Sequence, residues 1–194
     1  MTSDVTGLTD LLYEFGLLKR YKRTGWLVAG VRDPESVADH SFRTAVIAAV
    51  IAQLEGGDPQ RAAFMALFHD SQETRVTDIP YLGKRYLKAA SNEEVTADQT
   101  RDVAGPVADM VRDAVAEYEE KTSIEAVCAR DADKLECLLQ AVEYREQGNH
   151  NTQGWIDSSL AAITTTTGKR LAEEALSTGT LDWVVRVLNG GGAP

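Results

Sequence analysis

The chain has 194 residues, 43% of them hydrophobic and 26% charged, and a formal net charge of −10. This composition is that of an ordinary globular domain, long enough to bury a core without disulfides. The acidic balance argues against a surface that binds a nucleic-acid polymer, which is normally basic. Because no apolar run reaches about 20 residues and no signal-peptide pattern is present, we expect a cytoplasmic protein that makes no use of a membrane.

Hydrophobic spacing predicts helices from the start of the chain. The first covers about 8–18, and the second, poor in charge and therefore expected to be central, covers about 37–54. Ser36 is a plausible N-cap of this second helix. A third helix begins at Asp58-Pro59, a cap followed by proline at the first helical position, and ends at His69-Asp70.

The helical pattern continues through the second half of the chain. Residues 81–90 are expected as a short helix or an ordered loop, and the later helices over about 92–104, 106–120, 123–147, 155–165, 169–176 and 181–188. Cys128 and Cys137 lie too far apart along one helix for a disulfide and are expected as thiols. Strand-type alternation does not persist anywhere. The prediction is an all-α, single-domain helical bundle over residues 1–189, followed by a flexible tail at 190–194.

Two of the three histidines lie on apolar helices, close to carboxylates. His40 is near the start of the second helix, and the pair His69-Asp70 closes the third. Buried imidazole and carboxylate groups must be hydrogen-bonded or must bind a cation. One such histidine would more often be a hydrogen-bonded core residue, but together with a later helical aspartate the set favours a metal site. His150, in a polar loop, is expected to have no functional role.

The fourth ligand remains open on spacing alone. Large apolar residues of the long helix form one stripe that contains Asp131, whereas Asp133 lies on the opposite side among mostly small residues. A central helix buried on two faces can present either carboxylate, so the two are equal candidates. Two nitrogen and two oxygen ligands suit one divalent transition-metal ion (Mn, Co, Ni, Fe or Zn). At a five- or six-coordinate ion they leave positions for water and substrate.

Six motifs occur in a fixed order: Lys22-Arg-Thr-Gly-Trp26, Glu35-Ser-Val-Ala-Asp-His40, His69-Asp-Ser-Gln-Glu73, Thr77-Asp-Ile-Pro80, Ala132-Asp133-Lys-Leu135 and Leu138-Leu-Gln-Ala-Val-Glu-Tyr144. With them, residues 8–145 resemble HD-domain phosphohydrolases, in particular the HD-domain 5′-deoxynucleotidase family. The aspartate of Ala-Asp-x-Leu is a metal ligand in that family. The resemblance therefore implies an HD-type fold, a homodimer and four metal ligands: His40, His69, Asp70 and Asp133.

The resemblance also implies roles for two further carboxylates. Glu73, four residues after His69, is placed for proton transfer if the third helix continues for one more turn, although an exposed carboxylate at a helix end has the same pattern. In the similar enzymes this glutamate is catalytic. Asp78 precedes Pro80 in a turn, where a carboxylate often only hydrogen-bonds backbone amides. The resemblance places Asp78 in the substrate site, near the sugar and the attacking water.

Trp26 and a nearby arginine are the expected substrate-binding residues. Trp26 is either a core aromatic or, as the resemblance implies, the side chain that crowds the sugar 2′ position and favours deoxyribose. In some relatives an arginine directly precedes this tryptophan; here a glycine does, and Arg23 is the nearest candidate for the phosphate. Arg43, one turn after His40, is a second candidate that can instead pair with Glu35 or Asp39.

The expected reaction is hydrolysis of nucleoside 5′-monophosphates, with deoxy forms favoured, to nucleoside and phosphate. A divalent ion would lower the pKa of bound water and polarise a phosphoryl oxygen. One alternative is an HD phosphohydrolase that acts on a nucleoside triphosphate or a specialised-metabolite phosphate. Another is a non-catalytic binding module with a structural ion, in which Glu73 beside four ligands would be surplus.

Overall fold

The computed structural model describes residues 2–190 and the side chains of residues 5–190. Helices dominate this part of the chain and strands are absent from it, so the all-α prediction is confirmed. The expected flexible tail falls mostly on residues 191–194, which lie outside the described residues. The elements are α1 (Thr2–Phe15), η1 (Gly16–Lys19), α2 (Thr24–Val28), α3 (Val37–Glu55), α4 (Pro59–Phe68), α5 (Glu73–Val76), α6 (Tyr81–Lys84), α7 (Asn92–Gln99), α8 (Gly105–Glu120), α9 (Ile124–Glu146), η2 (His150–Thr152), α10 (Gln153–Ala162), α11 (Thr166–Ser177) and α12 (Asp182–Leu188).

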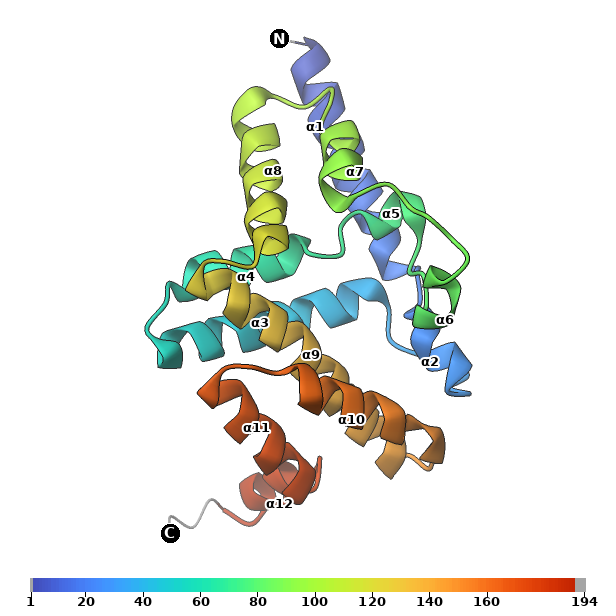
Figure 1. Ribbon diagram of the computed structural model, residues 1–194, viewed down its shortest axis with the longest axis vertical. Helices are drawn as coiled ribbons and strands as arrows, with labels where there is room; N and C mark the ends of the chain where they lie inside the picture. Colours follow the sequence, from blue (N-terminus) through green and yellow to red (C-terminus); the bar gives the residue numbers. More distant parts are fainter. Residues whose placement is uncertain (1, 191–194) are drawn as a thin grey trace.

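Helices α3 and α9 lie across the middle of the molecule and share its most extensive helix–helix contact (Figure 1). Helix α4 packs against both of them. Helices α1, α7 and α8 gather at one end of the molecule, and α10, α11 and α12 at the other (Figure 1). The two central helices therefore carry side chains that meet at the centre of the fold.

Local sequence fixes where the central helices begin and end. Ser36 and Asp39 form a capping box at the start of α3, which ends at Gly56 with a left-handed φ of 83°. Asp58 caps α4, and Pro59 occupies its first turn. Small buried residues on α9 let its neighbours approach closely; these are Ala126, Ala129, Ala132 and Ala141.

Three segments differ from the expected helices. Helix α4 ends at Phe68, so the continuation considered for Glu73 does not occur. The hydroxyl of Ser71 donates to the Phe68 carbonyl and so competes with the helical hydrogen bonds there. Helix α7 ends at Gln99, well before Pro106, and only Tyr81–Lys84 of the 81–90 segment is helical. Within the described residues, no helix is long and apolar enough to cross a membrane.

Candidate metal centre and catalytic pocket

Four side chains from three segments converge at the centre of the bundle. His40 comes from α3, His69 and Asp70 from the turn after α4, and Asp133 from α9. The Nε2 atoms of the two histidines are 3.3 Å apart. His40 Nε2 is 3.4 Å from Asp133 Oδ1, and His69 Nε2 is 3.2 Å from Asp70 Oδ2. The structure thus brings together all four residues that the resemblance implies as ligands.

The orientation of both imidazoles fits a metal ion. Nδ1 of His69 lies 2.6 Å from the carbonyl oxygen of Ala66, which can only accept, so Nδ1 carries the proton and Nε2 is left as an acceptor. Nδ1 of His40 lies 2.5 Å from Glu136 Oε2, which favours the same tautomer. Two lone pairs and two carboxylates then face one another at short range. This arrangement requires a cation between them.

The pKa shifts within the cluster also indicate a site for a positive charge. Burial and Arg23 oppose a charged His40, yet Glu136 and Asp133 raise its pKa to about 10. Burial raises the pKa of Asp133, but His40 and Lys134 outweigh it and hold that pKa well below its usual range. A divalent ion bound at the same place would satisfy these carboxylates in place of a proton.

Glu136 supports His40 from behind, and sequence reasoning missed it. Its second oxygen accepts from Arg43 Nε at 3.0 Å, and Arg43 also donates to Glu143 at 2.6 Å and to Gln140 at 2.8 Å. Arg43 therefore pairs with neither Glu35 nor Asp39, which corrects the expected pairing, and it is not among the residues that line the adjoining cavity. Glu136 lies one helical turn after Asp133, and this spacing is the signal that could have identified it.

The two candidate aspartates of α9 have different partners. Asp131 is buried and accepts from the backbone N–H groups of Thr164 and Thr165 at the start of α11. Asp133 lies on the other side of α9, beside His40. The structure thus bonds Asp131 to the segment that leads into α11 and places Asp133 in the cluster.

Glu73 is the first residue of α5 and is not a solvated carboxylate. Its Oε2 atom is buried and has no hydrogen-bond partner among the described residues. Burial, together with the nearby Asp70 and Asp78 carboxylates, raises its pKa to about 9. The side chain lines the cavity that adjoins the cluster. A buried acid without a partner beside a candidate metal site is suited to proton transfer.

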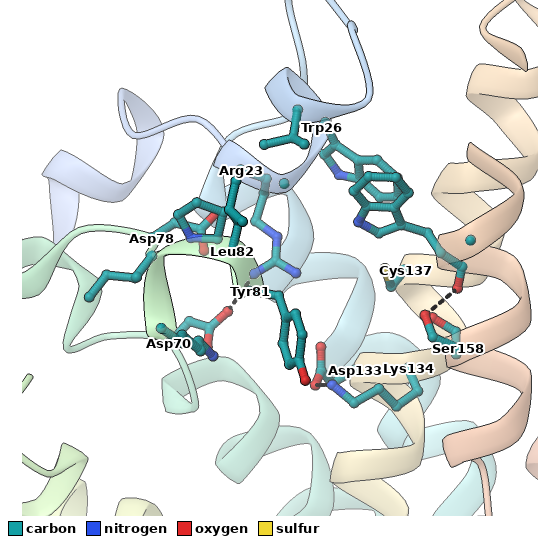
Figure 2. A pocket seen from close by; sticks show the side chains of 18 of the residues that line it. Arg23, Trp26, Asp70, Asp78, Tyr81, Leu82, Asp133, Lys134, Cys137 and Ser158 are labelled. Atoms are coloured by element: carbon teal, nitrogen blue, oxygen red, sulfur yellow. Dashed lines mark hydrogen bonds and ion pairs between the residues drawn. The ribbon is translucent and has the colours of Figure 1, made fainter. Parts of the chain in front are cut away.

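A cavity of about 670 Å³ opens onto the cluster. Its walls come from α2, from the segment around α6, from α9 and from α10 (Figure 2). Arg23, at the N-cap of α2, donates to Asp70 Oδ2 at 3.1 Å. Asp78 accepts from the backbone N–H of Thr24 at 2.5 Å, so its bond to a backbone amide is to distant α2 and not within its own turn, and it also lines the cavity.

Trp26 is both a core aromatic residue and part of the cavity wall. It is 2% exposed, packs edge-on against Tyr144, and donates through Nε1 to Glu35 at 2.9 Å. It also lines the cavity, next to Trp155 of α10, whose ring centroid is 5.7 Å away. Sequence reasoning missed Trp155 because it lies outside the six motifs. His150 lies on the exposed surface, away from the cavity.

Known proteins share this architecture and much of this sequence. A family model described as HD domain matches residues 15–175. 5′-Deoxynucleotidase HDDC2 of Homo sapiens is 35% identical over 145 residues, which cover 72% of this chain and 69% of the relative. The solved structure of a conserved hypothetical protein from Pyrococcus furiosus is 32% identical with a TM-score of 0.71, covering 88% of this chain and 99% of that one.

A third relative is similar over almost the whole length of both chains. It is the solved structure of a predicted metal-dependent phosphohydrolase from Magnetospirillum magnetotacticum, 25% identical with a TM-score of 0.67, covering 99% of this chain and 97% of that one. The family match spans most of the chain and includes His40, His69, Asp70 and Asp133. The chain belongs to the HD-domain family and, within it, to the group that contains the 5′-deoxynucleotidases.

Proposed function

We propose that this protein is a metal-dependent phosphomonoesterase that hydrolyses (deoxy)nucleoside 5′-monophosphates to nucleoside and phosphate. The observation that carries the proposal is the position of Glu73: its Oε2 atom is buried and has no hydrogen-bond partner among the described residues, and its side chain lines the cavity that opens onto the four-residue cluster. The name of the human relative, a 5′-deoxynucleotidase, supports a nucleotide substrate.

In this proposal His40, His69, Asp70 and Asp133 hold one divalent transition-metal ion (Mn, Co, Ni, Fe or Zn). A bound ion supplies an activated water and polarises a phosphoryl oxygen. Glu136 and the Ala66 carbonyl fix the two imidazoles so that Nε2 of each points to the ion position. The donor set, two nitrogens and two carboxylates, is one that any of these five metals accepts.

The remaining side chains act on the substrate and on protons. Glu73 exchanges a proton with the attacking water or the leaving oxygen, and burial keeps that proton at neutral pH. The Arg23 guanidinium, held by Asp70, faces the phosphate. Asp78, bonded to the first turn of α2, lies near the sugar and the attacking water, and Trp26 limits the space at the sugar 2′ position.

Phosphate release from a panel of nucleotides tests this function. Purified protein, loaded with each divalent ion in turn, should release phosphate from deoxynucleoside 5′-monophosphates. Glu73→Ala should lower kcat by at least about 100-fold, the usual scale for loss of a positioned acid or base. Glu93→Ala, which changes an exposed glutamate of α7, is the matched control and should keep wild-type activity. Full activity of Glu73→Ala would remove Glu73 from the mechanism.

The same panel separates the two alternatives. Preferential release from nucleoside triphosphates or from other phosphate esters would assign the site a different substrate. No release with any ion, together with a tightly held ion that has no exchangeable water, would instead assign a structural metal in a binding module.

We also propose that the protein acts in the cytoplasm as a homodimer, as the family resemblance implies. An exposed apolar stripe on α3 offers surface for a second copy; it consists of Phe42, Val46, Val50 and Leu54. Sedimentation equilibrium should give twice the 21.1 kDa mass of one chain. A single species of that chain mass at micromolar concentration would contradict the dimer.

A further inference from the structure

Lys134 is a cavity-lining cation whose bonding capacity is largely unused. Its Nζ atom lies 2.7 Å from Asp133 Oδ2, and its side chain is 41% exposed. Among the residues that the structure describes, Asp133 is its one hydrogen-bond acceptor. An ammonium group carries three donors, so Lys134 has two left to offer to a ligand in the cavity.

Arg23 and Lys134 each contact a different candidate ligand carboxylate. Arg23 contacts Asp70 Oδ2, the oxygen that also lies 3.2 Å from His69 Nε2, and Lys134 contacts Asp133 through the oxygen that does not face His40. The two cations reach the cavity from different elements, α2 and α9 (Figure 2). A phosphate bound at the cluster would therefore have a cation on each of two sides.

The charge of the cavity favours a second cation beside the phosphate. Four carboxyl groups line it, namely Asp70, Glu73, Asp78 and Asp133, and Glu73 holds its proton at neutral pH. The three ionised groups would repel a phosphomonoester, which carries nearly two negative charges at neutral pH. A divalent ion and Arg23 together offset these three charges and leave no excess positive charge for the phosphate. Lys84 and Lys134 are further cations that line the cavity, and of the two Lys134 contacts a candidate ligand carboxylate.

We infer that Lys134 binds a non-bridging oxygen of the substrate phosphate, opposite Arg23, while it keeps its bond to Asp133. This inference rests on the proposed function, because it names a second substrate-binding cation of the same site. The flexible lysine stem and its rotatable donors allow one ammonium to serve both acceptors. Lys134 is thus a residue that touches substrate, in contrast to Arg43, which acts only through Glu136.

Binding of inorganic phosphate to the metal-loaded, full-length protein tests the inference directly. Calorimetric titration should give a dissociation constant at least about tenfold weaker for Lys134→Met than for wild type, the scale of one lost charge-assisted hydrogen bond. Lys134→Arg keeps the charge and should stay within about threefold of wild type. Lys169→Met, which removes an exposed lysine of α11, is the matched control and should bind phosphate like wild type.

Metal content and kinetics complete the experiment. With metal content equal to wild type, Lys134→Met should raise KM for the nucleotide more than it lowers kcat. Phosphate affinity within twofold of wild type would overturn the inference. The inference would also be overturned if Lys134→Met lost the ion but bound phosphate normally once excess metal was added. Lys134 would then only orient Asp133.

The outcomes separate this inference from the proposed function. Lysine-dependent phosphate binding without release of phosphate from any nucleotide would refute the proposed function and leave Lys134 as an anion ligand. Nucleotide hydrolysis with phosphate binding that ignores Lys134 would refute the inference alone. A metal-loaded wild type with no measurable phosphate affinity would refute the inference, whereas the proposed function would still stand or fall on phosphate release from nucleotides.

Discussion

Glu73 illustrates how a single carboxylate acquires its properties from distant parts of the chain. Its own sequence neighbourhood, His69-Asp-Ser-Gln-Glu73, is polar and would suit a solvated turn. The fold instead buries its Oε2 atom and brings it near Asp78 as well as Asp70. Desolvation and two like charges then favour the protonated acid.

The raised pKa of Glu73 makes the stability of the metal-free protein depend on pH. Between the ordinary value of 4.5 and its folded pKa of about 9, the folded chain holds a proton that the unfolded chain has released. The free energy of unfolding should therefore fall as pH rises through this range, by up to about 1.4 kcal/mol per pH unit from this group. Glu73→Gln cannot titrate and should lack this part of the decline.

Urea unfolding of the metal-free protein at pH 5, 6, 7 and 8 measures the difference between wild type and Glu73→Gln. Glu93→Gln is the control, since its carboxylate is exposed and should leave the pH profile unchanged. Parallel profiles for wild type and Glu73→Gln would show that the Glu73 carboxyl is not protonated in the fold.

For single residues, the sequence identifies candidate metal ligands better than it identifies the residues that hold those ligands in place. His40, His69, Asp70 and Asp133 stand out because polar groups are rare on apolar helices. Glu136 and Lys134 do not stand out, because glutamate and lysine are common on any helix. The partners of Glu136 lie on α3, and only the fold shows that Lys134 lines a cavity. The partners of a charged side chain depend on packing that periodicity does not specify.

At the scale of elements, α9 is the helix that organises the site. One of its sides presents Asp133 and Glu136 to α3, while Asp131 on another side binds the start of α11. Spacing could not decide between Asp131 and Asp133 because both sides of a central helix are buried. Start signals were more informative: Ser36, Asp58 and Ser123 each cap the helix that follows them.

Asp131→Ala should destabilise the protein while it leaves the metal site intact. The change leaves the backbone N–H groups of Thr164 and Thr165 without their buried acceptor. The expected loss in free energy of unfolding is about 2 kcal/mol. Chemical denaturation measures this loss, and metal analysis should show an ion content equal to wild type.

Asp133→Asn is the paired variant with the opposite outcome. It should lose the ion during dialysis, because it removes a ligand carboxylate, yet keep the bond between Asp131 and α11. If Asp131→Ala lost the ion and Asp133→Asn retained it, the assignment of the two aspartates would be reversed.

At the scale of the whole molecule, the cluster joins segments that are far apart in sequence. Its ligands come from α3, from the turn after α4 and from α9, the helices at the centre of the fold (Figure 1). The all-α architecture is predictable because helical spacing and capping are local signals. The cavity is not, since its walls combine α2, α6, α9 and α10, and sequence spacing says little about how such distant segments pack.

Removal of the metal should lower the melting temperature of the whole protein. An ion that binds the folded chain alone adds about 2.7 kcal/mol of stability at a free concentration 100-fold above its dissociation constant. For a chain of this length that corresponds to roughly 5–10 °C. Calorimetry with and without a chelator measures the shift, and Asp133→Asn should show none. An equal shift in that variant would place the stabilising ion elsewhere.

Because carboxylates on two sides of α9 contact different helices, the chain should tolerate insertions and deletions in α9 poorly. Each residue of an α-helix turns the next by about 100°. Deletion of one residue between Ser123 and Asp131 would swing all later carboxylates of α9 around its axis together, away from His40 on one side and from Thr165 on the other. No single compensating substitution restores both contacts. The number of residues between Ser123 and Asp133 is thus constrained as well as the identity of Asp133. Among related chains, we expect this number to vary far less than the identities of the residues in between.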